Sequence, residues 1–327
     1  MSIDPAEFAA RLRAERDDPE RAEKLRLDRV ARRRKLTLWA GAGALVLGGF
    51  VFWLAQVTEG ERPANEPFAP GLLQEAMWPP EWPVTEHLPF RNSPAAGWPR
   101  ADLADGLHPP RAEPVAHLSE ERVAQDLETV RTFLREAHTS DEAVTGARPD
   151  RALALLAPGD ARGDAEDALT RPGPGRDPLR TFTRFDPAEV LVLEDVRARG
   201  SMTYEAAPAG GLLVHTDYTF VYAVIQTEGG WEITRGRQEA ARVVVRRQLD
   251  LTVRPDRKLV LGPAAYLVAN DDCAVPDDGY LHPLFSKAAA KAKEQARAKG
   301  GASFDPYAPG ARLPVPAPGS CPTPTRT

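Results

Sequence analysis

An uncharged stretch of 22 residues, Leu36–Val57, constrains this chain more than any other feature. It reads LTLWAGAGALVLGGFVFWLAQV, and only Thr37 and Gln56 in it are polar. A helix of this length is about 33 Å long, enough to cross a hydrocarbon core of about 30 Å. Trp39 and Trp53 lie near its two ends, where indole rings favour the headgroup region. A core helix rarely runs this long without charge, and a signal peptide's apolar region is shorter, about 7–15 residues. We therefore predict a transmembrane helix over 36–57.

The charges beside this stretch predict its orientation. Basic residues dominate before it: Arg26, Arg29, Arg32, Arg33, Arg34 and Lys35. Glu59, Glu61 and a single Arg62 follow it. Because basic flanks stay in the cytoplasm, residues 1–35 form a basic cytoplasmic arm and everything after Val57 is extracytoplasmic. The chain is expected to be a single-pass protein of the cell membrane, with the lipid bilayer as a partner.

Small residues recur every four positions within the span, at Ala40, Ala44 and Gly48. Such a stripe lets two membrane helices approach closely, which makes a homodimer one expectation. Small residues are common throughout this chain, so composition alone is the simpler explanation.

Proline divides the extracytoplasmic part. Of the 32 prolines, twelve fall between Thr58 and Leu118 and seven between Ala302 and Thr327. The expected parts are a proline-rich arm (58–117), a folded domain (118–285), a basic alanine-rich helix (286–300) and a proline-rich tail (301–327). After the span, 31 basic residues face 39 acidic ones, a balance of −8. An acidic ectodomain repels phosphate backbones, so nucleic acid is excluded as a partner.

The arms are expected to be disordered except where aromatic residues lie on the domain. The first arm contains five that a pure linker does not need: Phe68, Trp78, Trp82, Phe90 and Trp98. The run WPPEWP, Trp78–Pro83, is either a proline-rich ligand or a packing element, and packing is the preferred interpretation.

The folded domain opens with helical patterns. Leu118, Ser119 and Val123 stand at the positions of a hydrophobic staple. The apolar stripe then continues at helical spacing through Leu127, Val130 and Leu134. Shorter helices are predicted over 150–156 and 160–169, before the breaker PGPG at 172–175.

Alternation of period two follows. Strands are predicted over 190–199 and 201–205 with a bulge at Gly200, and over 212–226, 242–253 and 259–268, the last bent by Gly262–Pro263. Arg247 interrupts the apolar side of its strand and needs a partner or an edge position.

Helices followed by consecutive strands predict an α+β ectodomain, with helices packed on a mostly antiparallel sheet. A cone-shaped sheet like that of the nuclear-transport-factor-2-like superfamily fits this order, and GGWEI at Gly229–Ile233 is a turn-strand pattern found there. Such a fold hosts enzymes, binding modules and inert scaffolds, so it does not establish function.

No residues form a recognisable catalytic motif. Ser201, His215 and Asp217 are the elements of a triad, but no nucleophile elbow surrounds the serine. The six histidines lack zinc-ligand spacing, the acidic loop around Cys273 lacks EF-hand spacing, and no phosphate-binding glycine loop is present. No catalytic, cofactor-binding or metal-ligating residue is therefore assigned, and no cofactor is expected.

Several segments resemble a family of actinobacterial, chiefly streptomycete, single-span membrane proteins of unknown function. They are DPLRTFTRFDPAEV (Asp177–Val190), RARGSMTYEA (Arg197–Ala206), VHTDYTFVYAV (Val214–Val224), VVRRQLDL (Val244–Leu251), FRNSPAAGW (Phe90–Trp98) and ARPDRALALLAP (Ala147–Pro158). A cysteine after the last strand and another near the C-terminus also match. The resemblance covers most of the ectodomain and implies an anchored protein of the cell envelope. It carries no activity and no catalytic residues.

Three functions remain open at this point. The first is a non-enzymatic, membrane-anchored interaction or sensing module of the cell envelope, which could include envelope proteins among its partners. The alternative is a cell-envelope hydrolase with a site near His215 and Asp217. A weaker third is signalling through the cytoplasmic arm.

The chain contains two cysteines, Cys273 and Cys321, and they allow a first test of the predicted topology. Both lie on the extracytoplasmic side of the predicted span, where an even number of cysteines indicates a disulfide. In the chain-entropy model, closing this loop stabilises the fold by roughly 4 kcal/mol. Mass spectrometry without reductant is expected to find the two cysteine peptides linked. Alkylation of both thiols under those conditions contradicts the bond.

Overall fold

A computed structural model describes residues 75–324, with gaps at 76, 80–81, 104, 228–232, 235–236, 273–274, 276, 287, 292–293, 295–302, 309–312 and 314–322. The chain divides into two compact units, Met1–Ala69 and Pro70–Thr327, and every described residue belongs to the second. None of the helices in this described part is long and apolar enough to cross a bilayer. The predicted span, 36–57, lies outside it.

A five-stranded antiparallel sheet organises the domain. Its strands are β1 (Val190–Val192), β2 (Arg197–Ala206), β3 (Leu212–Gln226), β6 (Ala241–Val253) and β7 (Leu259–Ala269). The order is β1-β3-β6-β7, and β2 also pairs with β3, beside β1. A small hairpin, β4 (Ile233–Thr234) and β5 (Arg237–Gln238), lies between β3 and β6 in the chain. The predicted α+β class with a mostly antiparallel sheet is confirmed.

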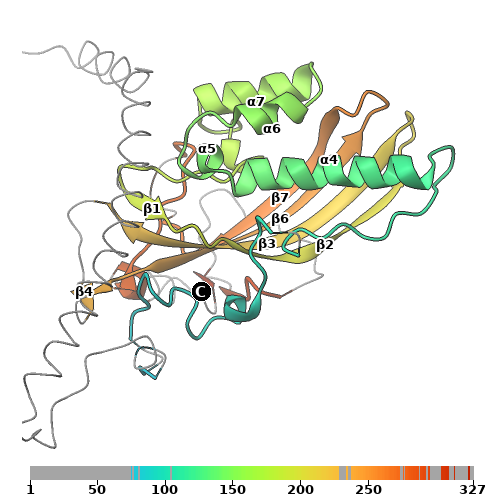
Figure 1. Ribbon diagram of the computed structural model, residues 1–327. Helices are drawn as coiled ribbons and strands as arrows, with labels where there is room; N and C mark the ends of the chain where they lie inside the picture. Colours follow the sequence, from blue (N-terminus) through green and yellow to red (C-terminus); the bar gives the residue numbers. More distant parts are fainter. Residues whose placement is uncertain are drawn as a thin grey trace, which may run out of the picture. The chain divides into compact units, whose positions relative to one another are not determined.

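The helices cover one face of this sheet. They are α4 (Glu120–His138), α5 (Asp141–Val144), α6 (Asp150–Leu155) and α7 (Asp160–Thr170), with 3₁₀ turns at Pro94–Gly97 and Pro178–Arg180. Figure 1 shows α4 lying across the strands, with α5, α6 and α7 on the same side. Ser119 caps α4 as predicted, because its side chain accepts a hydrogen bond from the backbone N–H of Arg122. The predicted stripe of α4 is buried.

Aromatic side chains of β3 fill the space under α4. Tyr218, Phe220 and Tyr222 project from alternate positions of β3 and are at most 2% exposed. Phe220 packs between the other two rings at centroid distances of 6.3 Å, and Phe185 meets Tyr222 edge-on at 5.4 Å. The helical face of the sheet is therefore a filled core.

The proline-rich arm and the tail cover part of the opposite face. Phe90, Trp98 and Tyr307 form a buried cluster with small apolar residues of β3 and β6, and the ring of Tyr307 meets Trp98 edge-on at 5.5 Å. The tail also contributes a short parallel pair, β8 (Ser303–Phe304) with β9 (Thr323–Pro324). The expectation that aromatic residues of the arm lie on the domain is confirmed for Phe90 and Trp98. The expectation of a disordered tail is wrong for Tyr307, which is buried in the same cluster.

Arg91 explains how the WPPEWP segment is ordered. Its guanidinium donates to four backbone carbonyls, those of Trp78, Pro79, Trp82 and Pro83, at 2.9–3.3 Å. The side chain is buried and lies over the Trp78 ring at 5.9 Å. Proline removes backbone donors from this segment, so an arginine satisfies the acceptors that remain. The preferred interpretation, packing, is confirmed.

Two predicted strand irregularities have different outcomes. Gly200 lies in the regular part of β2, opposite Tyr218, where an added Cβ would approach the Asp217 carbonyl oxygen to 2.1 Å. The break in the edge strand falls at 193–196 instead, between β1 and β2. The predicted bulge at Gly200 is therefore wrong: close backbone packing requires this glycine. The predicted irregularity at Gly262–Pro263 is confirmed by a register shift opposite Leu249 and Leu251.

Arg247 has the partners that its position in an apolar strand face requires. It lies on the central strand β6 and is 4% exposed. Its guanidinium donates to the carbonyl oxygens of Leu179 and Phe182 and, at 3.1 Å, to the Thr183 hydroxyl. Among the described residues no carboxylate pairs with it, and burial lowers its pKa. Together with the hydrogen bond from the Tyr222 hydroxyl to the Thr183 hydroxyl, Arg247 joins the sheet to the segment 178–183.

Arg247→Met is expected to lower the free energy of unfolding by about 2–4 kcal/mol, because buried carbonyl oxygens lose their donors. Denaturant unfolding of the full chain measures the change. Arg199→Met is the matched control, since Arg199 is exposed on β2 and is expected to change stability by less than about 0.5 kcal/mol. Equal effects of the two substitutions would contradict the proposed role of Arg247.

Candidate functional site

The polar residues of β3 face away from the helices. His215, Asp217 and Thr219 alternate with the buried aromatic residues and lie on the second face of the sheet, as predicted. Antiparallel pairing places Asp250, Gln248 and Arg246 of β6 directly opposite them. Ser201 and Thr203 of β2 flank the same rows on the other side. We call these polar side chains of β2, β3 and β6 the polar rows.

Asp217 is held by two residues of the neighbouring strand. Arg246 donates to both carboxylate oxygens, at 2.9 and 2.7 Å, and Gln248 donates to the second at 3.0 Å. Arg246 is buried, so its charge is paired in a partly desolvated setting. With one arginine and one amide on it, Asp217 is a structural carboxylate rather than a free base.

His215 pairs with Asp250, not with Asp217. Its Nδ1 lies 2.8 Å from Asp250 Oδ1, and its Nε2 lies 3.7 Å from Glu205 Oε1. The hydrogen bond to Asp250 outweighs partial burial and raises the pKa of His215 above its ordinary value. The imidazole is therefore biased toward its charged form, which is a poor general base.

The elements of the suggested triad are not assembled. Ser201 lies opposite Asp217 in the sheet, whereas Thr203 lies opposite His215. Among the residues that the structure describes, the Ser201 hydroxyl has no hydrogen-bond partner. These three residues are therefore not arranged as a hydrogen-bonded triad, because Arg246 and Gln248 bind Asp217 and Asp250 binds His215.

The tail closes one end of the polar rows. The backbone N–H of Leu313 donates to Gln248 Oε1 at 3.0 Å, and Leu313 is buried. At the other end Thr203 and Glu205 are exposed. The open part of this face therefore surrounds the His215–Asp250 pair, with Thr203 and Glu205 on β2. Sequence reasoning found His215 but missed Asp250 as its partner, since only the pairing of β3 with β6 reveals it.

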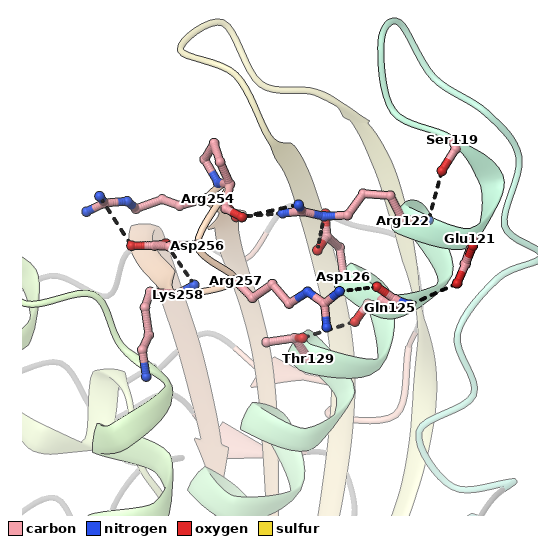
Figure 2. Close-up of polar contacts among 11 residues, drawn as sticks. Ser119, Glu121, Arg122, Gln125, Asp126, Thr129, Arg254, Asp256, Arg257 and Lys258 are labelled. Carbon is pink, nitrogen blue, oxygen red and sulfur yellow. Dashed lines mark hydrogen bonds and ion pairs between the residues drawn. The ribbon is translucent and has the colours of Figure 1, made fainter.

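A second group of polar contacts joins the turn between β6 and β7 to the start of α4 (Figure 2). Arg122 donates to the carbonyl oxygens of Arg254 and Pro255, at 2.8 and 3.2 Å, and to both carboxylate oxygens of Asp126 at 2.9 Å. Asp126 is fully buried; burial raises its pKa although Arg122 opposes the shift. In the same turn, the Arg257 guanidinium donates a hydrogen bond to Gln125 Oε1. These groups satisfy one another, which indicates a structural contact between hairpin and helix.

In the described ranges, no group of three or more histidine, cysteine, aspartate or glutamate residues could hold a metal ion. Cys273 and Cys321, predicted to form a disulfide, lie outside the described residues, as do most of the residues of the GGWEI pattern. The predicted helix over 286–300 is helical at Ser286, at 288–291 and at Glu294.

Comparisons with protein-family models, with curated proteins and with solved structures gave no match. The function of this protein is therefore inferred from its own residues and their geometry.

Asp250→Asn is expected to lower the pKa of His215, because the neutral amide removes the hydrogen-bonded negative charge that raises it. Since the folded pKa is raised, the stabilisation from this pair is present below the unfolded pKa of about 6.5 and is lost as pH rises through the folded value. Histidine NMR titration measures the shift. Glu205→Gln is the control and should lower the pKa less, because Glu205 lies farther from the ring. A larger effect of Glu205→Gln would refute the assignment.

Proposed function

We propose that this protein is a membrane-anchored, extracytoplasmic interaction or sensing module of the cell envelope without enzymatic activity. The observation that supports this proposal is that the charged side chains of the polar rows are already hydrogen-bonded to one another. Arg246 and Gln248 bind Asp217, and Asp250 binds His215. Ser201 lies opposite Asp217, whose carboxylate is already occupied by Arg246 and Gln248. Groups engaged in this way can recognise a partner but are not arranged to activate a nucleophile.

The filled core favours the same function. A ligand or substrate site usually needs a concave pocket lined by a few convergent polar groups. Under α4 the sheet instead carries the buried side chains of Tyr218, Phe220 and Tyr222, with the Phe220 ring packed against both tyrosine rings. The surface around His215 on the other face is therefore the part of this domain best suited to contact a partner.

The proposal includes a fold and a family resemblance. The order of helices and antiparallel strands is compatible with a nuclear-transport-factor-2-like domain, and the segments quoted above resemble the streptomycete single-span membrane proteins. Placement in the membrane, with the N-terminus in the cytoplasm, is supported by the uncharged run Leu36–Val57 and its basic flank.

Site-specific photocrosslinking tests the interaction surface. A photoreactive residue at Thr203, exposed beside the His215–Asp250 pair, is expected to crosslink to an envelope component in intact cells. The same residue at Ala124, exposed on α4, is the matched control and should not capture that component. Glu205→Lys should reduce the Thr203 crosslink several-fold, because it reverses a charge at the edge of the surface. Equal crosslinking from both positions would argue against a specific surface.

An enzyme assay distinguishes the alternative, an envelope hydrolase, from the proposed function. The purified full chain is expected to show no turnover of cell-envelope polymers or ester substrates. Turnover that disappears in His215→Ala and persists in His117→Ala, an exposed histidine elsewhere, would overturn the proposed function and establish the hydrolase.

A further inference from the structure

The loop that follows β7 contacts the turn before β1 through the side chain of His282. His282 lies near the end of this loop, and its side chain is only 11% exposed. Its Nδ1 is 2.9 Å from Glu189 Oε2, in the turn that leads into β1, and its Nε2 is 3.1 Å from Asp278 Oδ1, in the loop itself. The imidazole thus joins two segments that are 93 residues apart in the chain.

The chemistry of the ring makes this contact depend on protonation. An ionised carboxylate only accepts hydrogen bonds, and a neutral imidazole has one N–H donor. With a carboxylate at each ring nitrogen, both contacts are hydrogen bonds only when both nitrogens carry hydrogen. The arrangement of Glu189, His282 and Asp278 therefore requires the imidazolium form.

The same residue carries backbone bonds that close the loop. The His282 N–H donates to Asp271 Oδ1 at 2.6 Å, and the His282 carbonyl accepts from the Asp272 N–H at 2.8 Å. One residue earlier, the Leu281 N–H donates to the Arg184 carbonyl at 2.9 Å. Loss of the ring contacts therefore weakens the point where the loop is attached.

The other charged groups near this point are few. Asp271 and Asp272 lie beside His282, and burial raises the pKa of Asp271 to about 6. On the neighbouring segment, the Arg184 guanidinium lies over the Tyr280 ring at 5.0 Å and donates to the Gly146 carbonyl oxygen at 2.8 Å. Among the described residues named here, the carboxylates outnumber the cations, which favours a protonated histidine among them.

We propose that the segment 277–283 forms a pH-sensitive clamp, in which protonated His282 holds this segment against the turn before β1 and deprotonation releases it. Under the proposed extracytoplasmic placement, the external pH acts on this clamp directly.

The direction of the effect follows from linkage. Burial lowers the pKa of His282, but the hydrogen bonds and charges of Asp278 and Glu189 outweigh it and raise the pKa above its ordinary value. A group with a raised folded pKa contributes stability below its unfolded pKa and loses it as pH rises through the folded value. Asp271, whose pKa is also raised, acts with the same sign, so a variant must separate the two.

Hydrogen exchange of the full chain, followed by mass spectrometry, tests the clamp. Exchange is measured from about pH 5.5 to about pH 8.5, which brackets the ordinary histidine pKa of about 6.5, and is corrected for the intrinsic pH dependence of amide chemistry. Protection of peptides covering 277–283 is expected to fall several-fold as pH rises, while peptides from α4 keep theirs. Unchanged protection of the loop across this range would overturn the proposal.

Three variants assign the effect. His282→Gln removes the charge and is expected to give low protection at every pH. His215→Gln, which removes a carboxylate-paired histidine from the other sheet face, should keep the wild-type fall, and so should Asp271→Asn. A wild-type fall in His282→Gln, or its loss in Asp271→Asn alone, would assign the titration elsewhere and refute the clamp.

A titration of the wild-type chain keeps the test independent of whether His282→Gln folds. With histidine labelled at the ring carbon, one of six resonances should respond to both Glu189→Gln and Asp278→Asn by a lower pKa. That resonance should titrate above the ordinary value in the wild-type chain. A pKa at or below the ordinary value would overturn the proposal.

Discussion

Proline-broken segments present carbonyl groups without matching donors, and arginine side chains satisfy them throughout this domain. Proline has no N–H, so such a segment cannot complete a ladder of backbone hydrogen bonds. A guanidinium offers five donors in a rigid fork. Arg91 uses its fork on the segment 78–83, Arg242 on the carbonyls of Pro89 and Arg91, and Arg247 on the segment 178–183. Two of these arginines, Arg242 and Arg247, belong to the sheet, and Arg91 belongs to the arm itself.

This dependence has an energetic consequence for both faces of the sheet. Burial lowers the pKa of Arg242 and of Arg247, which means that their charged forms are poorly solvated. Such groups are tolerated only when their hydrogen bonds are made. On one face Arg247 joins β6 to the segment under α4, and on the other Arg242 holds the arm. The His215 side chain, on the face away from the helices, remains partly exposed.

The elements themselves were largely predictable, and their contacts were not. Period two located β3 and β6 within one residue, and helical spacing located α4 with its Ser119 cap. Each signal lies within one continuous segment and depends on burial of one side of it. The break in the edge strand was assigned to Gly200, although it falls at 193–196, because a glycine in a strand indicates a bulge and close packing equally well.

The sequence by itself determined the expectation of a membrane span with its orientation, the α+β class, and which face of β3 is polar. Each depends on how one stretch of chain partitions between water and an apolar phase, and that property is local. Only the tertiary structure decided that Asp250 and not Asp217 pairs with His215, that Arg247 satisfies backbone carbonyls, and that Glu189 meets His282. These partners are separated by 35, 65 or more residues, and strand register and chain packing bring them together.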